Sequence, residues 1–186
     1  MKRIIISAVM LLLIEGAFAQ QAQFGIKGGI NFANIKDEAA GNTADARTGF
    51  NVGGLAHIHI TRAFAVQPEI VYSTQGAEYD NGTLKLNYIN VPVLAQFMFG
   101  DGFRLQTGPQ LGILTTSKFK SGDTKVDVDG YRTADLAWSF GASYIGHMGL
   151  GIDARYNLGL TDVTKSSSTD LKNRVWQLGL FYQFKH

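Results

Sequence analysis

The stretch that decides the fold is the C-terminal one, Arg174-Val-Trp-Gln-Leu-Gly-Leu-Phe-Tyr-Gln-Phe-Lys-His186. Its residues alternate between two parities, as successive side chains of a β-strand do. One parity carries the large apolar side chains Trp176, Leu178, Leu180, Tyr182 and Phe184. The other carries Gln177, Gly179, Gln183 and Lys185, with Val175 and Phe181 as its apolar members. The stretch therefore predicts a strand with one apolar face, and we expect it to close the structure formed by the rest of the chain.

Aromatic side chains two residues apart near the end of a final strand are typical of membrane β-barrels, where amphipathic rings lie at the lipid interface. The set Gln177, Gly179, Tyr182 and Phe184 resembles the C-terminal β-signal by which the bacterial barrel-assembly machinery recognises its clients. In such clients the final aromatic residue is often the last one, whereas here Lys185 and His186 follow. The resemblance implies that this machinery is a partner during biogenesis.

The N-terminus has the pattern of a secretory signal. Lys2 and Arg3 precede a short apolar run, and Ala17-Phe18-Ala19 fits a cleavage site. The alternative, a membrane-anchoring helix, is disfavoured because the run is short and Glu15 interrupts it. We therefore expect a cleaved signal peptide at residues 1–19 and one exported domain at residues 20–186.

Composition narrows the class of protein further. The 186-residue chain has 22 Gly, 3 Pro and no Cys, so it has neither a disulfide framework nor an acylatable Cys. Without Lys2, Arg3 and Glu15, the remaining 15 basic and 14 acidic residues form no basic stripe. This balance argues against a nucleic-acid partner.

The mature chain divides into eight segments of period-two alternation with no convincing helical periodicity. They cover residues 24–32, 50–60, 64–77, 86–99, 103–113, 135–144, 150–161 and 174–184. Long polar connections, at 34–47, 116–133 and 162–173, follow segments one, five and seven, whereas segments two, four and six end in short turns; only the linker after segment three is shorter than this pattern requires. In the fourth segment Leu86 and Tyr88 fall on the opposite parity from Ile89 and Val91, which predicts a bulge or a rim contact near Asn87.

A water-soluble barrel such as a lipocalin would also give eight alternating strands, so the decision depends on which parity faces inward. One parity is almost wholly large and apolar, and the other is rich in Gly, Ala, Ser and scattered charges. Eight strands leave room only for side chains inside, so the small polar parity fits the lumen and the apolar parity fits lipid. The sequence predicts an all-β, eight-stranded antiparallel up-and-down transmembrane barrel in the outer membrane, with short periplasmic turns and longer extracellular loops.

Several motifs resemble a known family: Phe24-Gly-Ile-Lys-Gly-Gly-Ile-Asn-Phe32, Gln67-Pro-Glu-Ile-Val-Tyr-Ser-Thr-Gln-Gly76, Asn90-Val-Pro-Val-Leu94, Gly151-Ile-Asp-Ala-Arg-Tyr-Asn-Leu-Gly-Leu-Thr161 and the closing stretch. Together they are similar to the small porin-like, PorT-type outer-membrane barrels of Bacteroidetes, and more generally to eight-stranded barrels of the OmpA and OmpX type. The resemblance implies an outer-membrane location and this fold. PorT-type proteins are linked to a secretion apparatus, so the resemblance also implies a secretion-associated role as an alternative.

Five charged residues fall on the inward parity near the short turns: Lys27, Glu69, Arg104, Asp153 and Arg155. Buried charges must be paired, so we expect a structural ion network in the lumen, with a proton or ion path as the alternative. If chain order is spatial order, Glu69 reaches toward Arg155, and Asp153 offsets Lys27 and Arg104.

Catalytic and metal sites are weighed on the same map. His57 and His59 at i and i+2 suggest a shared metal, but no third ligand is evident, and Asp127-Val-Asp129-Gly130 lacks the Glu that completes a calcium loop. A lipid-modifying barrel needs His and Ser at the outer rim, whereas here Ser117 and Ser121 fall at the end opposite His57. We expect no catalytic residue, cofactor or metal. The expected role is structural or one of surface interaction: the barrel lies in outer-membrane lipid, and its extracellular loops contact an unidentified partner. A narrow passive pore is the alternative.

Overall fold

A computed structural model of the chain describes residues 22–37, 45–79, 82–121, 124–127, 130–164 and 171–184. The predicted signal peptide at residues 1–19 lies outside the described residues. Within the described part the chain forms nine β-strands: β1 (Ala22–Asp37), β2 (Asp45–His59), β3 (Phe64–Tyr79), β4 (Gly82–Phe99), β5 (Phe103–Ser121), β6 (Thr124–Asp127), β7 (Ala134–Ile145), β8 (Leu150–Gly159) and β9 (Leu171–Gln183). No described helix has the length and apolar character needed to cross a membrane.

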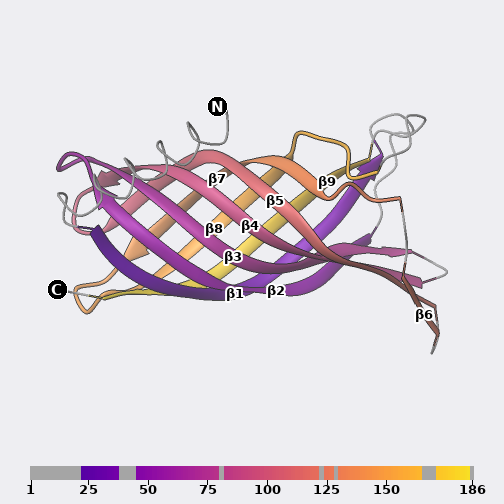
Figure 1. The fold of residues 1–186 in the computed structure, drawn as a ribbon. Helices are drawn as coiled ribbons and strands as arrows, with labels where there is room; N and C mark the ends of the chain where they lie inside the picture. Colours follow the sequence, from indigo (N-terminus) through magenta and orange to yellow (C-terminus); the bar gives the residue numbers. More distant parts are fainter. Residues whose placement is uncertain are drawn as a thin grey trace.

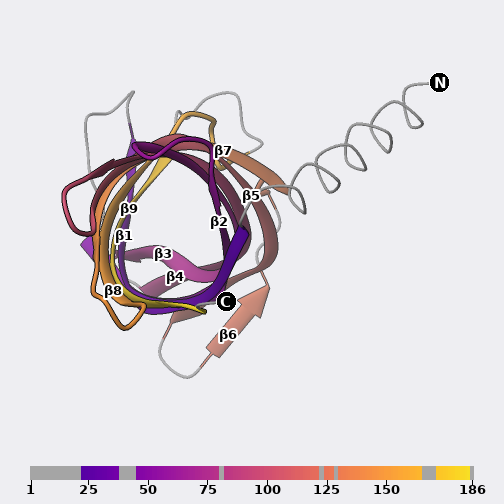
Figure 2. The ribbon, with the colours of Figure 1, turned by 90° about the vertical axis from the view of Figure 1, so that its left-hand side faces the viewer.

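Eight of these strands close into a barrel. The hydrogen-bonded order is β4-β3-β2-β1-β9-β8-β7-β5-β6, and β4 also pairs with β5. All pairings are antiparallel, and the ring is seen end-on in Figure 2. The closing strand β9 pairs with β1 and β8, and β6 extends the sheet only beside the far end of β5. The predicted up-and-down topology is confirmed.

The closing strand has the two faces that its sequence predicts. Trp176, Leu178 and Leu180 are 47–57% exposed on the outside of the barrel. Val175 and Phe181, the two apolar members of the other parity, are 2% and 6% exposed in the lumen. The same alternation runs around the ring, so the exterior of the barrel is apolar and its outward side chains meet hydrocarbon. Closure of the barrel gives every backbone group a hydrogen-bond partner in lipid.

The predicted long loops are partly wrong. The structure continues β1 to Asp37, begins β2 at Asp45, continues β5 to Ser121 and begins β9 at Leu171. In these extensions the strands still pair, because pairing provides hydrogen bonds for the backbone N–H and C=O groups. The alternation of apolar and polar side chains that is typical of a strand in lipid is weaker there. Figure 1 shows these extensions at one end of the barrel and the turns at residues 60–63, 100–102 and 146–149 at the other. Gly100 and Gly102 have φ values of 53° and 125°, a conformation that favours glycine in such a tight turn.

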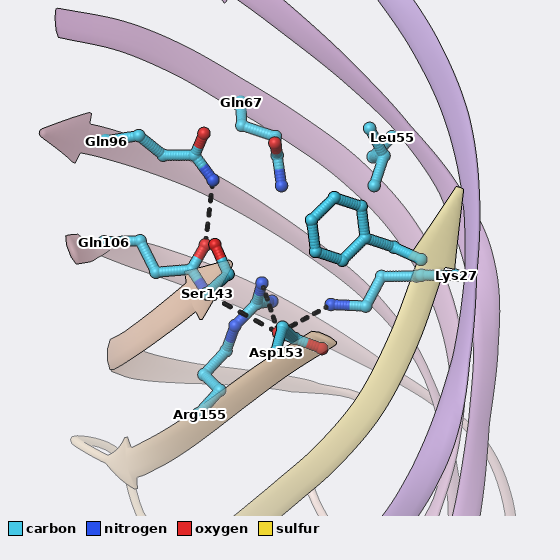
Figure 3. Close-up of a pocket in the computed structure, with 9 residues that line it drawn as sticks. Lys27, Leu55, Gln67, Gln96, Gln106, Ser143, Asp153 and Arg155 are labelled. Atoms are coloured by element: carbon cyan, nitrogen blue, oxygen red, sulfur yellow. Dashed lines mark hydrogen bonds and ion pairs between the residues drawn. The ribbon is translucent and has the colours of Figure 1, made fainter. Parts of the chain in front are cut away.

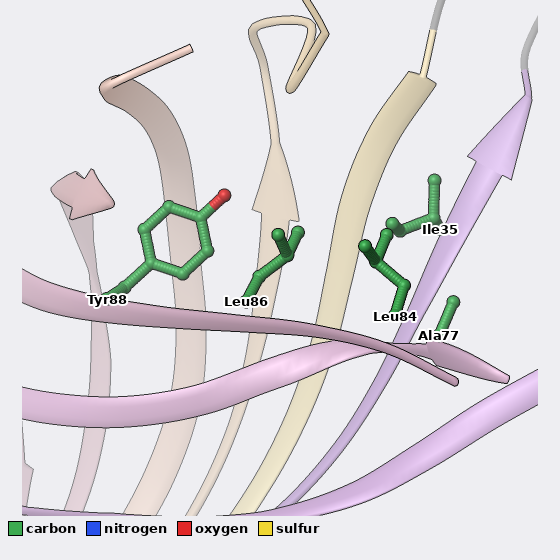
Figure 4. Packing of buried hydrophobic residues seen from close by; sticks show 5 residues of the cluster. All are labelled: Ile35, Ala77, Leu84, Leu86 and Tyr88. Atoms are coloured by element: carbon green, nitrogen blue, oxygen red, sulfur yellow. The ribbon is translucent and has the colours of Figure 1, made fainter. Parts of the chain in front are cut away.

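The irregularity expected near Asn87 is confirmed. The β4–β5 register shifts between Asn87 and Tyr88, because β5 contains an extra residue, Thr115, whose Oγ1 donates to the Asn87 carbonyl at 2.9 Å. Leu86 and Tyr88 turn into the barrel at this level. They form a cluster with Ile35, Ala77 and Leu84, which we call the apolar plug (Figure 4).

Candidate functional site

The half of the lumen nearer the short turns contains a compact ion network. Glu69 on β3 accepts two hydrogen bonds from Arg155 on β8, at 2.9 Å each, so the guanidinium and carboxylate meet in a bidentate pair. Lys27 Nζ on β1 lies 3.4 Å from Glu69 and 3.3 Å from Asp153. Asp153 is also 3.4 Å from Arg155 Nη2, as the dashed lines of Figure 3 indicate. Two cations and two anions thus join three strands across the lumen.

Burial makes this pairing necessary. Glu69 and Arg155 are each 2% exposed, and Lys27 and Asp153 are each 6% exposed. A charge removed from water to this extent is tolerated only where partners and hydrogen bonds replace its hydration. Gln67 supplies one more bond, since its Nε2 donates to Glu69 Oε1 at 2.8 Å. The arrangement holds opposite walls of the barrel in a fixed geometry.

Arg104, the fifth residue of the expected network, lies apart from the other four. Its Nη2 donates to Gln183 Oε1 at 3.0 Å, and its Nη1 lies 3.5 Å from His57 Nδ1. It makes no ion pair with any described residue. The expectation that Asp153 offsets Arg104 is therefore wrong, because the Asp153 carboxylate contacts Lys27, Arg155 and Gln106 instead.

A layer of amide and hydroxyl side chains, which the sequence reasoning missed, fills the middle of the lumen. Asn31 Nδ2 donates to Ser73 Oγ at 2.9 Å, and Asn31 Oδ1 accepts from Asn51 at 2.6 Å and from Gln177 at 3.1 Å. The recurrence of Asn and Gln on the inward parity is the signal that identifies such a layer. Gln177, expected as part of the β-signal, is thus also an interior hydrogen-bond donor.

The other residues of the expected β-signal also lie at the end of the chain that pairs with β1 and β8. Tyr182 and Phe184 are 40% and 43% exposed on the apolar exterior, with ring centroids 5.5 Å apart. Gly179 is paired with Gly29 of β1, and a Cβ atom added to Gly179 would lie 2.9 Å from the carbonyl oxygen of Gly28. Glycine therefore permits the close approach of β9 to β1 at the seam of the barrel.

Very little free space remains among these side chains. The cavity between the ion network and Gln96, Gln106 and Phe181 has a volume of about 10 Å³. A single water molecule needs roughly 10–15 Å³ measured in the same way. Beyond the amide layer the apolar plug occupies the other half of the lumen. Side chains thus occupy the lumen at the level of the ion network and at the level of the apolar plug.

His57 and His59, which the sequence suggests as a shared metal site, lie next to each other. The His57 and His59 rings meet edge to face at 4.4 Å, and His57 Nδ1 lies 2.8 Å from Gln96 Oε1. Over the residues that the structure describes, no group of three His, Cys, Asp or Glu side chains is arranged to hold a metal ion. Part of the Asp127–Gly130 stretch lies outside those residues.

A closed antiparallel barrel with an apolar exterior and polar, paired side chains inside its membrane-spanning part defines the class of small transmembrane β-barrels. Residues 18–165 match the family model described as "Outer membrane protein beta-barrel domain". The chain belongs to this family and is an outer-membrane protein.

Solved structures share this fold. Ail, the attachment invasion locus protein of Yersinia pestis, is similar with a TM-score of 0.57 at 20% identity, over 88% of this chain and 99% of Ail. Neisserial surface protein A is similar with a TM-score of 0.65 at 15% identity, over 89% of this chain and 100% of that protein. No curated protein matches the sequence. At these identities the likeness concerns the fold alone.

Proposed function

We propose that this protein is a non-enzymatic outer-membrane barrel whose strand extensions contact a partner outside the cell. The observation that carries the proposal is strand length: β4 has 18 residues and β5 has 19, whereas β8 has 10. A transmembrane strand needs only about 9–11 residues. The surplus of β4 and β5 stands beyond the apolar band as ordered sheet, with Lys85 and Asn87 on its outer face.

The interior supports this assignment over a pore. A passive pore requires a continuous aqueous path, which eight-stranded barrels do not usually provide, and here charges, amides and the apolar plug occupy the lumen in succession. A lipid-modifying enzyme requires His and Ser side chains together at the outer rim of the barrel. His57 lies near the short turns, whereas Ser117 lies on the extension of β5 at the opposite end.

The orientation behind the proposal can be tested directly, because the chain contains no Cys. A membrane-impermeant maleimide should label Lys118→Cys in intact cells and should not label Arg62→Cys, which lies in a short turn. Both variants should react after the cells are broken. Labelling of Arg62→Cys alone in intact cells would show that the short turns face outward, and it would contradict the proposed outer surface.

The function itself is tested by complementing a deletion strain with three forms of the protein. A form in which residues 77–84 are replaced by a two-residue turn should fail to correct the phenotype of the deletion strain, whereas wild type and a Glu69→Gln/Arg155→Gln form should correct it. Rescue by the trimmed form but not by the lumen form would favour a pore instead. The PorT-type resemblance to barrels of Bacteroidetes adds a finer alternative, a secretion-associated role, which predicts loss of secreted proteins in the same deletion strain.

A further inference from the structure

The apolar exterior of the barrel is interrupted by an open groove over β1. It has a volume of about 560 Å³, far larger than the cavity inside the lumen. Sites for small molecules usually measure roughly 300–1,000 Å³. The walls of the groove are outward side chains of four neighbouring strands: Ile26, Val52, Leu150, Leu180 and Tyr182. The groove therefore has the size of a ligand site, and its walls belong to the surface that faces lipid.

The floor of the groove is backbone. Lys27 and Phe181 also line it, but their side chains lie in the lumen at 6% exposure, so only their main chain reaches this face. Gly28 occupies the outward position between Val52 of β2 and Leu180 of β9. Because Gly28 has no side chain, the backbone of β1 stays uncovered where the other outward positions of this strand carry large apolar groups.

The fold does not require a glycine at position 28. A Cβ atom added to Gly28 would meet only the Asn51 carbonyl oxygen, at an ordinary contact distance of 3.7 Å, and its φ lies outside the left-handed region. At Gly179, by contrast, an added Cβ would lie 2.9 Å from the Gly28 carbonyl oxygen. Glycine weakens a strand interior and often marks the close approach of a ligand or of another backbone. A molecule seated against β1 accounts for Gly28, whereas strand pairing does not.

One end of the groove lies at the membrane interface. Leu150 is the first residue of β8 after the turn at residues 146–149, and it pairs with Tyr182. A Cβ atom added to Gly149 would lie 3.5 Å from Tyr182 Cε2, so the ring lies beside this turn. Tyrosine is favoured at such a level because its ring is apolar and its hydroxyl reaches the wet headgroups. The groove thus combines an apolar trough with a hydroxyl donor at headgroup level.

A glycerophospholipid matches both features of the groove. An acyl chain fills the apolar trough, and the ester carbonyl at the head of that chain accepts a hydrogen bond from a hydroxyl. A second copy of this chain fits less well, because a twofold dimer places the same patch on both sides of the interface. Two concave grooves that face each other would enclose a void. The short turns lie at the periplasmic side in the proposed orientation, where the leaflet consists of glycerophospholipid.

We propose that the groove over Gly28 binds one acyl chain of a glycerophospholipid from the periplasmic leaflet, whose ester carbonyl accepts from the Tyr182 hydroxyl. The inference goes beyond the proposed surface function and involves only the membrane-spanning part of the barrel. It shares with that function the assignment of the short turns to the periplasm, which the cysteine labelling tests separately.

The test measures lipid retention by native mass spectrometry on the folded protein extracted from outer membranes in a mild detergent. The wild type should retain one glycerophospholipid per barrel. Gly28→Val covers the floor of the groove, so it should retain about tenfold less. Ala95→Val is the matched control, because Ala95 is a half-buried outward residue on β4, away from the groove, and this variant should retain as much as the wild type.

A second variant decides the matter if Gly28→Val does not assemble. Tyr182→Phe keeps the aromatic ring of the closing strand but removes the hydroxyl, so it should retain about fivefold less glycerophospholipid. Tyr144→Phe, at an outward tyrosine near the same end of β7, should retain the wild-type amount. Unchanged retention in Tyr182→Phe would overturn the contact with the ester carbonyl.

Three results for the wild type would overturn the proposal as a whole. Retention no greater than that of Gly28→Val would show that the groove meets only exchanging bulk lipid. Retention of lipid A in place of glycerophospholipid would put the groove in the opposite leaflet. A wild-type dimer that Gly28→Val converts to a monomer would show that a second copy fills the groove.

Discussion

The half of the lumen near the short turns is filled by charges and amides, whereas the half beyond the amide layer is filled by Leu84, Leu86 and Tyr88. The difference follows from what surrounds each level of the barrel. In the membrane the exterior must be apolar, so the inward parity is left for polar groups, which must pair. Beyond the apolar band both Lys85 and Asn87 face outward, so the interior can be an ordinary apolar core.

Substitutions in the ion network and in the apolar plug should destabilise the barrel for different reasons. Removing one member of the ion network leaves a charge without its partner, whereas removing a side chain of the apolar plug leaves a void next to water. Variants in each half therefore measure how much each chemistry stabilises the same barrel.

The largest loss is expected for Arg155→Ala. It removes the bidentate partner of Glu69 and leaves the two carboxylates of Glu69 and Asp153 to share the single cation Lys27, which should lower the free energy of unfolding by about 3–5 kcal/mol in a dry site. Urea unfolding in micelles measures the change. Arg62→Ala is the matched control, since that side chain is exposed in the turn at residues 60–63 and its removal should cost less than about 0.5 kcal/mol. An Arg155→Ala cost as small as that of the control would mean that water enters the network freely.

A smaller loss is expected for Leu86→Ala in the apolar plug. Leu86 is 0% exposed, and truncating a buried leucine costs about 2–5 kcal/mol, with the low end expected where solvent is close and the site can collapse. Val126→Ala on β6 serves as the control, because Val126 is 56% exposed. If Leu86→Ala exceeds Arg155→Ala, the apolar plug rather than the ion network is the main support of the barrel.

The third expectation sharpens the comparison by removing both partners of one pair. Glu69→Gln and Arg155→Gln together should cost less than the two single changes added, with a coupling of about 0.5–3 kcal/mol, because the double variant leaves no stranded charge within the bidentate pair. The same cycle on Leu86→Ala and Val126→Ala, which share no charge, should be additive within about 0.5 kcal/mol. Additivity of the charge cycle would contradict the bidentate pair.

The sequence predicted most of the membrane-spanning fold because lipid imposes alternation on every strand. It also predicted the charged residues of the lumen, since parity assigns Lys27, Glu69, Asp153 and Arg155 to one face. It could not separate Arg104 from them, because parity gives the face of a residue but not which partners its side chain reaches. The sequence predicts loops where the structure has strand extensions, because the alternation of apolar and polar residues is weaker outside lipid. Phe119, placed by the sequence in a loop, lies on β5 and packs against the apolar plug.

The smallest effect is expected in conductance, where the two halves act in series. The wild type should show no steady single-channel steps in planar bilayers, because the ion network leaves a cavity of only about 10 Å³ and the apolar plug closes the lumen a second time. Leu86→Ala should open the outer half alone, and the Glu69→Gln/Arg155→Gln pair should loosen the inner half alone, so each should remain silent. Two closures in series conduct only when both are open, so the combined triple variant is the one in which brief steps are expected. Steady steps from the wild type would show that the side chains do not close the lumen, and steps from Leu86→Ala alone would show that the ion network is permeable and that the plug is the only barrier.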